Sequence, residues 1–286
     1  MKELPVPTLA LSPVAMPRGS LHPYSPIQTT HAHRKLANKN NFAVQVEWAR
    51  HIDEVREAQR LRYKVFAIEM GARLKAPIPG HDMDRFDDYC EHLLVRDADT
   101  YQVIGTYRVL TPTQACRAGG FYSDTEFDLK NLSALRHRMV ELGRSCVHPD
   151  HRHGGVILAL WSALFEFMQR NQLDCLVGCA SIPLLHQGVM GGNVAASVWR
   201  KIQQTYMVSE EYSAHPHLPL PIDKLNGQLD VEPPALVKGM LRMGARVMGP
   251  PAWDPDFNSA DLPMLMHTSD IAPRYLRHFA AVRTEA

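Results

Sequence analysis

Two charged residues, Glu141 and Arg144, interrupt an apolar segment in the middle of the 286-residue chain. Residues 140–147 are typical of a buried strand, where burial raises the pKa of a carboxyl group and makes it a candidate base toward an ammonium. An ideal strand places positions three apart on opposite faces. Gly143 favours a β-bulge, which would turn both charges to one side. The alternative is an ordinary structural ion pair.

The segment that follows this strand has the composition of an anion-binding loop. Arg152, Gly154 and Gly155 come directly before a long apolar stretch that predicts a buried helix over residues 155–170. A helix N-terminus directs free N–H groups and the positive end of its dipole outward, so the loop predicts a phosphate site. A plain turn is the alternative. The neighbouring histidines do not complete a metal-binding spacing, and we expect no metal.

Further charged residues lie earlier in the chain. Arg62 and Arg108 are single cations in apolar surroundings, and Asp84 and Asp87 belong to an acidic run over residues 82–91. Arginine binds carboxylates bidentately, so the two arginines are candidates for holding a substrate carboxylate. The aspartates are candidates for holding a cationic amine. The alternatives are that the arginines pair with this acidic run and that the run is a solvated loop.

The hydrophobic pattern predicts both helices and strands. Helices are expected over residues 51–69, after Thr111, around 129–135, and over 155–170, 194–206, 235–243 and 274–282. Strands are expected over residues 44–48, 90–96, 102–110, 140–147, 173–180 and 264–267. This mixture predicts an α+β fold, an α/β sandwich with a mixed sheet flanked by helices and a strand–phosphate loop–helix unit at its centre.

Composition divides the chain into a tail and one domain. Residues 1–41 contain five basic residues, one acidic residue and several prolines, so we expect a disordered, solvated tail. The alternative is weak contact with anionic lipid at the inner membrane surface. Residues 42–286 are long enough for one domain with a sizeable core.

The remaining composition excludes several classes of protein. The formal net charge is +1, which argues against a nucleic-acid partner. Five cysteines without CxxC spacing argue against disulfides and zinc, and favour a reducing cytoplasm. Asp254-x-Asp256-x-Asn258 begins like a calcium loop, but Ser259 replaces the required glycine and Leu265 the terminal acid. We therefore do not expect a calcium loop there.

Four longer strings together resemble a known family, the ornithine acyl-carrier-protein N-acyltransferases of the GNAT superfamily. They lie at residues 141–157 (ELGRSCVHPDHRHGGVI), 178–183 (GCASIP), 233–244 (PPALVKGMLRMG) and 251–261 (PAWDPDFNSAD). The resemblance extends over roughly residues 43–281. A more distant similarity is to the acyl-homoserine-lactone synthases, whose characteristic charged positions follow the order Arg62, Asp84, Asp87, Arg108, Glu141 and Arg144. This chain has Gly143 where that family usually has serine.

The resemblance implies acyl transfer from a 3-hydroxyacyl thioester on acyl carrier protein to the α-amino group of ornithine. The product would be lyso-ornithine lipid, formed in the first step of ornithine lipid biosynthesis. Glu141 would be the base, with Arg144 beside it. Arg62 or Arg108 would bind the acceptor carboxylate, and Asp84 and Asp87 its side-chain ammonium.

The resemblance also concerns the donor. Arg152, Gly154 and Gly155 would hold the phosphate of the phosphopantetheine arm, with no separate cofactor. Ile157 stands where the usual coenzyme A loop has a small residue, which favours a carrier protein as donor. The alternatives are another acceptor amino acid, synthesis of a lactone signal, or a non-enzymatic module that binds a carrier or membrane. The presence of Glu141, Arg144 and Arg152 speaks against the last.

Overall fold

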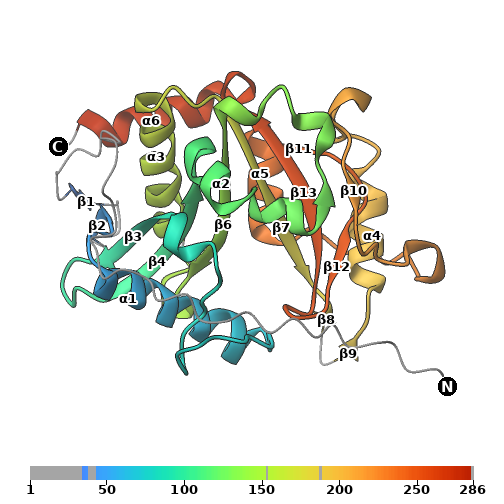
Figure 1. Cartoon of the computed structure of the whole chain (residues 1–286), viewed down its shortest axis with the longest axis horizontal. Helices are drawn as coiled ribbons and strands as arrows, with labels where there is room; N and C mark the ends of the chain where they lie inside the picture. Colours follow the sequence, from blue (N-terminus) through green and yellow to red (C-terminus); the bar gives the residue numbers. More distant parts are fainter. Residues whose placement is uncertain (1–33, 38–42, 153, 187–188, 285–286) are drawn as a thin grey trace.

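The computed structural model describes residues 34–37, 43–152, 154–186 and 189–284 (Figure 1). Most of the expected tail, including its possible lipid contact, lies outside these residues. Arg34–Ala37 form strand β1, which pairs antiparallel with β2 (Ala43–Trp48). This part of the expected tail therefore belongs to the sheet.

A nine-stranded mixed sheet forms the centre of the molecule, in the order β1-β2-β3-β4-β6-β7-β13-β11, with β12 also paired to β13. Its pairs are antiparallel except for β6 with β7, which is parallel. The bounds are β3 (Glu91–Asp97), β4 (Val103–Leu110), β6 (Met139–Val147), β7 (Cys175–Pro183), β11 (Arg246–Val247), β12 (Ala252–Asp254) and β13 (Ser259–His267). Two small pairs join β5 (Phe127–Asp128) to β10 (His215–Pro216), and β8 (Leu185–His186) to β9 (Val189–Met190).

Helices cover both faces of this sheet. Helix α1 (Ile52–Tyr63), extended by a π-helical segment over Lys64–Glu69, and α2 (Pro112–Ala118) pack on one face. The core on the other face contains α3 (Gly155–Arg170), α4 (Asn193–Ile202), α5 (Ala235–Met243) and α6 (Pro273–Thr284). Helix α3 lies beside α6, where Phe165 stacks on Phe279 with ring centroids 4.6 Å apart. These layers confirm the predicted fold class. Among the described residues, no helix is both long and apolar enough to cross a bilayer.

The two central strands separate partway along their length. β6 and β7 pair at only three positions, the last being Glu141 with Val177, although both strands continue well beyond it. Just past this point the backbones still touch: a Cβ on Gly178 would lie 2.4 Å from the Leu142 carbonyl oxygen. Only glycine permits this approach. The separation opens a space inside the sheet next to Glu141.

Most predicted elements are confirmed, with two exceptions. The helix expected around residues 129–135 is wrong, because only the short 3₁₀ turn Lys130–Leu132 forms there. The strand expected over residues 264–267 begins earlier, at Ser259. Asp261 and Pro263 interrupt the apolar pattern that the prediction relied on, yet both lie in register with β7.

Candidate active site

A cavity of about 710 Å³ lies at the separation of β6 and β7. Both strands line it, together with side chains from the start of α3 and from α5. Much of the wall is apolar, including Ile157 and Trp161 on α3 and Met240 on α5. Cavities of this size and polarity accommodate small molecules or acyl chains. Of the predicted site residues, those lining it are Arg108, Glu141, Arg144, Arg152 and Gly154.

Glu141 is buried at the inner end of this cavity, with 4% of its surface exposed. Its carboxylate accepts hydrogen bonds from the backbone N–H groups of Tyr122 (2.6 Å) and Ser123 (2.7 Å), and from the Ser123 hydroxyl. Burial raises the pKa of Glu141, and the hydrogen bonds from Ser123 and Tyr122 offset this only in part. A carboxylate held in a fixed orientation with a raised pKa is suited to general base catalysis.

The predicted bulge is present, one residue later than expected. Arg108 pairs with Gly143 and Thr106 with Cys146, so Arg144 and Ser145 together oppose Tyr107. Arg144 carries the unusual backbone angle, with φ of 50°. Such a conformation costs roughly 1–3 kcal/mol in a residue with a side chain, so the surrounding contacts must hold it.

These contacts enclose the Arg144 guanidinium. It lies between the rings of Tyr122 and Phe257, 4.7 and 4.3 Å from their centroids. Its charge pairs with Asp84 at 3.0 Å and Asp82 at 3.3 Å. Within the described residues, no ion pair with Glu141 is recorded, so the alternative of a Glu141–Arg144 ion pair is wrong.

The remaining predicted charges form a buried network beside Arg144. Arg62 is fully buried and donates to Asp82 and Asp87, each at 2.8 Å. Arg108 donates to Asp84 at 2.6 Å. Burial alone would raise the pKa of Asp87, but the Arg62 and Arg108 guanidiniums outweigh it and hold that pKa well below its usual range. Asp84 and Asp87, which were expected to bind substrate, are therefore paired with arginines. Arg62 does not line the cavity.

Arg152 lies at the outer end of the cavity, at the start of α3. Its guanidinium makes two parallel hydrogen bonds to Glu69, at 2.6 and 2.7 Å, and donates to the Val147 carbonyl oxygen at 3.1 Å. Gly154 precedes the helix with φ of 94°, and no side chain in the described part of the chain caps the helix N-terminus. Gly155 is the first helical residue. The first helical N–H groups are thus available to an anion.

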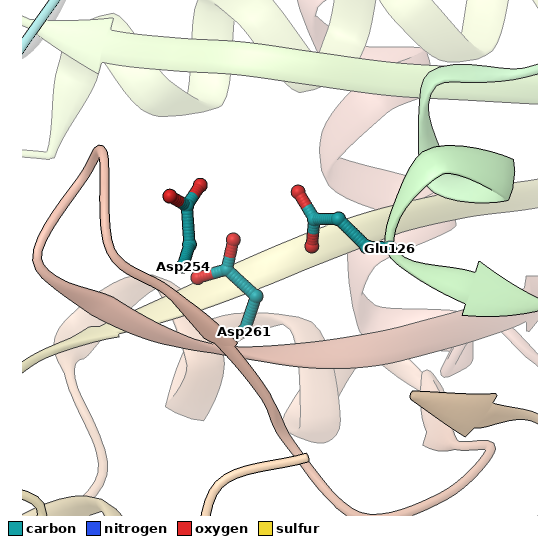
Figure 2. A group of neighbouring side chains, drawn as sticks. All are labelled: Glu126, Asp254 and Asp261. Atoms are coloured by element: carbon teal, nitrogen blue, oxygen red, sulfur yellow. The ribbon is translucent and has the colours of Figure 1, made fainter. Parts of the chain in front are cut away.

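Other residues at the site were not expected from the sequence. A second cavity, of about 560 Å³, adjoins the first, and Tyr122, Arg144 and Phe257 line both. Three carboxylates, from Glu126, Asp254 and Asp261, converge at this junction (Figure 2). Asp254 and Asp261 lie on the paired strands β12 and β13, but Glu126 is far from them in the sequence, so spacing could not reveal the cluster.

Comparison with known proteins first defines the class. Residues 61–162 match the acetyltransferase (GNAT) domain family, and this segment contains most of the main-cavity residues on β4, β6 and α3. Among solved structures, the chain resembles a coenzyme A-dependent acyl-homoserine lactone synthase, BjaI, with a TM-score of 0.48. The alignment has 16% identity and covers 82% of this chain and 85% of that one. The protein is an acyltransferase with a GNAT fold.

The curated relatives narrow this class. The L-ornithine N(alpha)-acyltransferase of Rhodobacter capsulatus is 34% identical over 85% of this chain and 97% of its own length. The protein of the same name from Brucella abortus is 33% identical over 79% of this chain and 85% of its own length. This chain belongs to the L-ornithine N(alpha)-acyltransferase family.

Proposed function

We propose that this protein transfers a 3-hydroxyacyl chain from acyl carrier protein to the α-amino group of ornithine. The product is lyso-ornithine lipid, formed in the first step of ornithine lipid biosynthesis at the cytoplasmic side of the membrane. The observation that carries this proposal is the buried Glu141, which faces an apolar cavity where β6 and β7 separate. Family membership supplies the acceptor.

In this proposal Glu141 removes a proton from the α-ammonium, directly or through a water molecule, before the amine attacks the thioester carbonyl carbon. The tetrahedral intermediate then collapses with cleavage of the C–S bond, and the phosphopantetheine sulfur takes up the second amine proton and leaves as a thiol. The backbone N–H groups of the bulge over residues 143–145 stabilise the resulting oxyanion. The irregular register at Arg144 and Ser145 supports this role, because bulge residues fall out of the regular ladder. Gly143 leaves open space, since a Cβ there would have no neighbour within 4 Å.

The donor enters from the end of the cavity where Arg152 lies. The phosphopantetheine phosphate binds the N–H groups at Gly154 and Gly155, and Arg152 exchanges part of its contact with Glu69 for this phosphate. The half-exposed position of Arg152 supports such an exchange. The acyl chain lies along the apolar wall formed by α3 and α5. We propose that this loop binds a single phosphodiester, as found in the arm of a carrier protein. This favours a carrier-protein donor over coenzyme A.

The acceptor lies between Glu141 and the arginine network. Arg108 and Arg144 line the cavity and are the proposed contacts for the acceptor carboxylate or the acyl 3-hydroxyl group. These arginines are held in place by Asp84, Asp87 and Arg62. This role replaces the direct substrate contacts that the resemblance implied for those three residues. The ion pairs of Arg62 with Asp82 and Asp87, and of Arg108 with Asp84, are consistent with this structural role.

The direct test is an assay with purified protein. It is incubated with labelled 3-hydroxyacyl carrier protein or the matching coenzyme A thioester, together with each amino acid in turn. We expect Nα-acylornithine by mass spectrometry, formed preferentially from the carrier protein. Consumption of a different amino acid, with ornithine untouched, would overturn the acceptor assignment. A preference for coenzyme A would overturn the donor assignment.

A further inference from the structure

Three carboxylates lie together at the junction of the two cavities. Glu126 lies between the 3₁₀ turn Tyr122–Thr125 and β5, Asp254 ends β12, and Asp261 lies within β13. Their side chains point toward one another (Figure 2), and one oxygen from each lies within 4.8 Å of the others. No ion pair with a described residue is recorded for any of them. The Asp254 carboxylate accepts hydrogen bonds from the backbone N–H groups of Asp256 (2.9 Å) and Phe257 (3.0 Å), so the site has a concentrated negative charge that backbone donors offset only at Asp254.

The cluster also contains buried acceptor atoms without donors. Asp261 is only 4% exposed, it lines the main cavity, and its Oδ1 has no hydrogen-bond partner. Both carboxylate oxygens of Glu126 are likewise shielded from solvent, and the neighbouring Tyr122 hydroxyl and Cys179 thiol offset the rise in its pKa only in part. Leaving buried acceptors unpaired is costly, so such atoms indicate a missing ligand.

The pKa values agree with this geometry. Burial raises the pKa of Glu126 well above its usual value, and the charges of Asp261 and Asp254 raise it further. Burial and the charge of Asp254 raise the pKa of Asp261 to about 6. Without a cation the cluster therefore retains protons, and a bound cation would replace them.

We propose that Glu126, Asp254 and Asp261 bind the side-chain ammonium of the acceptor amino acid and thereby select a diamino acid. A primary ammonium has three N–H donors. With hydrogen bonds of about 2.8 Å in a tetrahedral arrangement, the three acceptor oxygens lie roughly 4.6 Å apart. The observed spacing accommodates this arrangement. The inference rests on the proposed function, because it assigns a binding site to the second amino group of the same acceptor.

The position of the cluster relative to Glu141 supports this assignment. The Ser123 hydroxyl contacts both Glu141 and, at 3.4 Å, the Cys179 sulfur. Burial raises the pKa of Cys179, and the nearby Glu126 charge raises it further, so Cys179 adjoins the cluster. Along β7, Glu141 lies opposite Val177 and Asp261 lies opposite Ser181, so Cys179 is between these two positions on the strand.

The aspartates first expected to bind this ammonium are not available for it. Asp84 pairs with Arg108 and Arg144, and Asp87 with Arg62 and Arg108. A substrate ammonium bound there would face the guanidiniums of Arg62, Arg108 and Arg144. The cluster at Glu126 is the better site for a positively charged group.

The test compares two acceptors that differ only at this group. Norvaline has the carbon chain of ornithine without the terminal amine. We expect wild-type protein to favour ornithine in kcat/KM, and Glu126→Gln and Asp261→Asn each to reduce the ornithine-to-norvaline ratio roughly 10- to 100-fold. Glu210→Gln, at an exposed acid, is the matched control and leaves the ratio unchanged. An unchanged ratio in both cluster variants, or no preference in the wild type, would overturn the inference.

Two further measurements separate the remaining outcomes. Ornithine should raise the Tm of the wild-type protein more than norvaline does, and this holds even if the variants fail to fold. The wild-type protein and Asp261→Asn are also titrated with Mg²⁺, Ca²⁺ and Mn²⁺ in a calorimeter. We expect the two proteins to give the same result, because the cluster is not a metal site. Micromolar binding lost in that variant would identify a metal site and overturn the proposal. Absence of acyl transfer to any α-amino acid would instead refute the proposed function.

Discussion

Glu141 and Arg144 are three residues apart, yet they have different surroundings, and we propose different roles for them. Glu141 is held by a turn at Tyr122 and Ser123, whereas Arg144 is held by two aromatic rings and two aspartates. The rigid donors around Glu141 fix its carboxylate, and burial favours its protonated form. Both effects favour the proposed role of this group as a base toward an amine.

Replacement of this carboxylate tests its role as a base. Glu141→Gln preserves size but keeps only one of the two acceptor oxygens, and it should reduce kcat about 10²- to 10⁴-fold, with KM for the donor little changed. The basic form of Glu141 appears as the pH rises through its raised pKa, so the acidic limb of wild-type kcat/KM should lie above the ordinary glutamate value and vanish in the variant. Tm and circular dichroism verify the fold. Near-normal turnover would remove Glu141 from this role.

At the level of elements, buried ion pairs join α1 to the loop that precedes β3. Arg62 on α1 reaches Asp82 and Asp87, and Arg108 on β4 reaches Asp84 and Asp87. The same aspartates hold the bulge of β6 through Arg144. Removing one partner from a buried network leaves an uncompensated charge, which is strongly destabilising. The network therefore positions the bulge that faces the cavity.

Arg62 distinguishes such support from substrate binding. Arg62→Met should lower the free energy of unfolding by about 3–5 kcal/mol in urea titrations. Arg56→Met is the matched control on the same helix: its pair with Asp53 is exposed, and we expect a change below about 1 kcal/mol. A stable Arg62→Met variant with a strongly raised KM for ornithine would contradict this and restore the direct contact that the resemblance implied.

At the level of the whole molecule, the site requires segments from both halves of the chain. The carboxylate cluster joins a loop near β5 to β12 and β13, which lie far along the chain from Glu141. Burying acids without a cation opposes folding, and functional sites commonly have such a cost in stability. The empty protein should therefore gain stability when one of these charges is removed.

The dependence of stability on pH measures this effect. The pKa of Asp261 is raised to about 6 in the folded protein from 3.8, so this group contributes stability below pH 3.8 and loses it as the pH rises through 6. Asp261→Asn should exceed wild type by about 1–3 kcal/mol at pH 7.5, and the difference should disappear near pH 4. Urea unfolding at both pH values, with Glu210→Gln as control, provides the measurement. A destabilised variant at pH 7.5 would contradict the raised pKa.

The sequence was sufficient where the information is local. Apolar periodicity predicted the central strand and α3, and Gly143 indicated a bulge within one residue of its position. Four long strings indicated the family. Pairings of the charges were not local: the acidic run and the two arginines were recognised, but the possibility that they pair with one another could only be stated as an alternative.

The sequence by itself determined the layered α+β fold, the family and the position of Glu141, because periodicity and motif strings are properties of neighbouring residues. Tertiary structure alone decided that Arg62 is buried among aspartates and that β6 and β7 separate after Glu141. It also brought Glu126 to Asp254 and Asp261, which lie more than a hundred residues further along the chain. Sheet order, which no local pattern encodes, determines which side chains share a cavity.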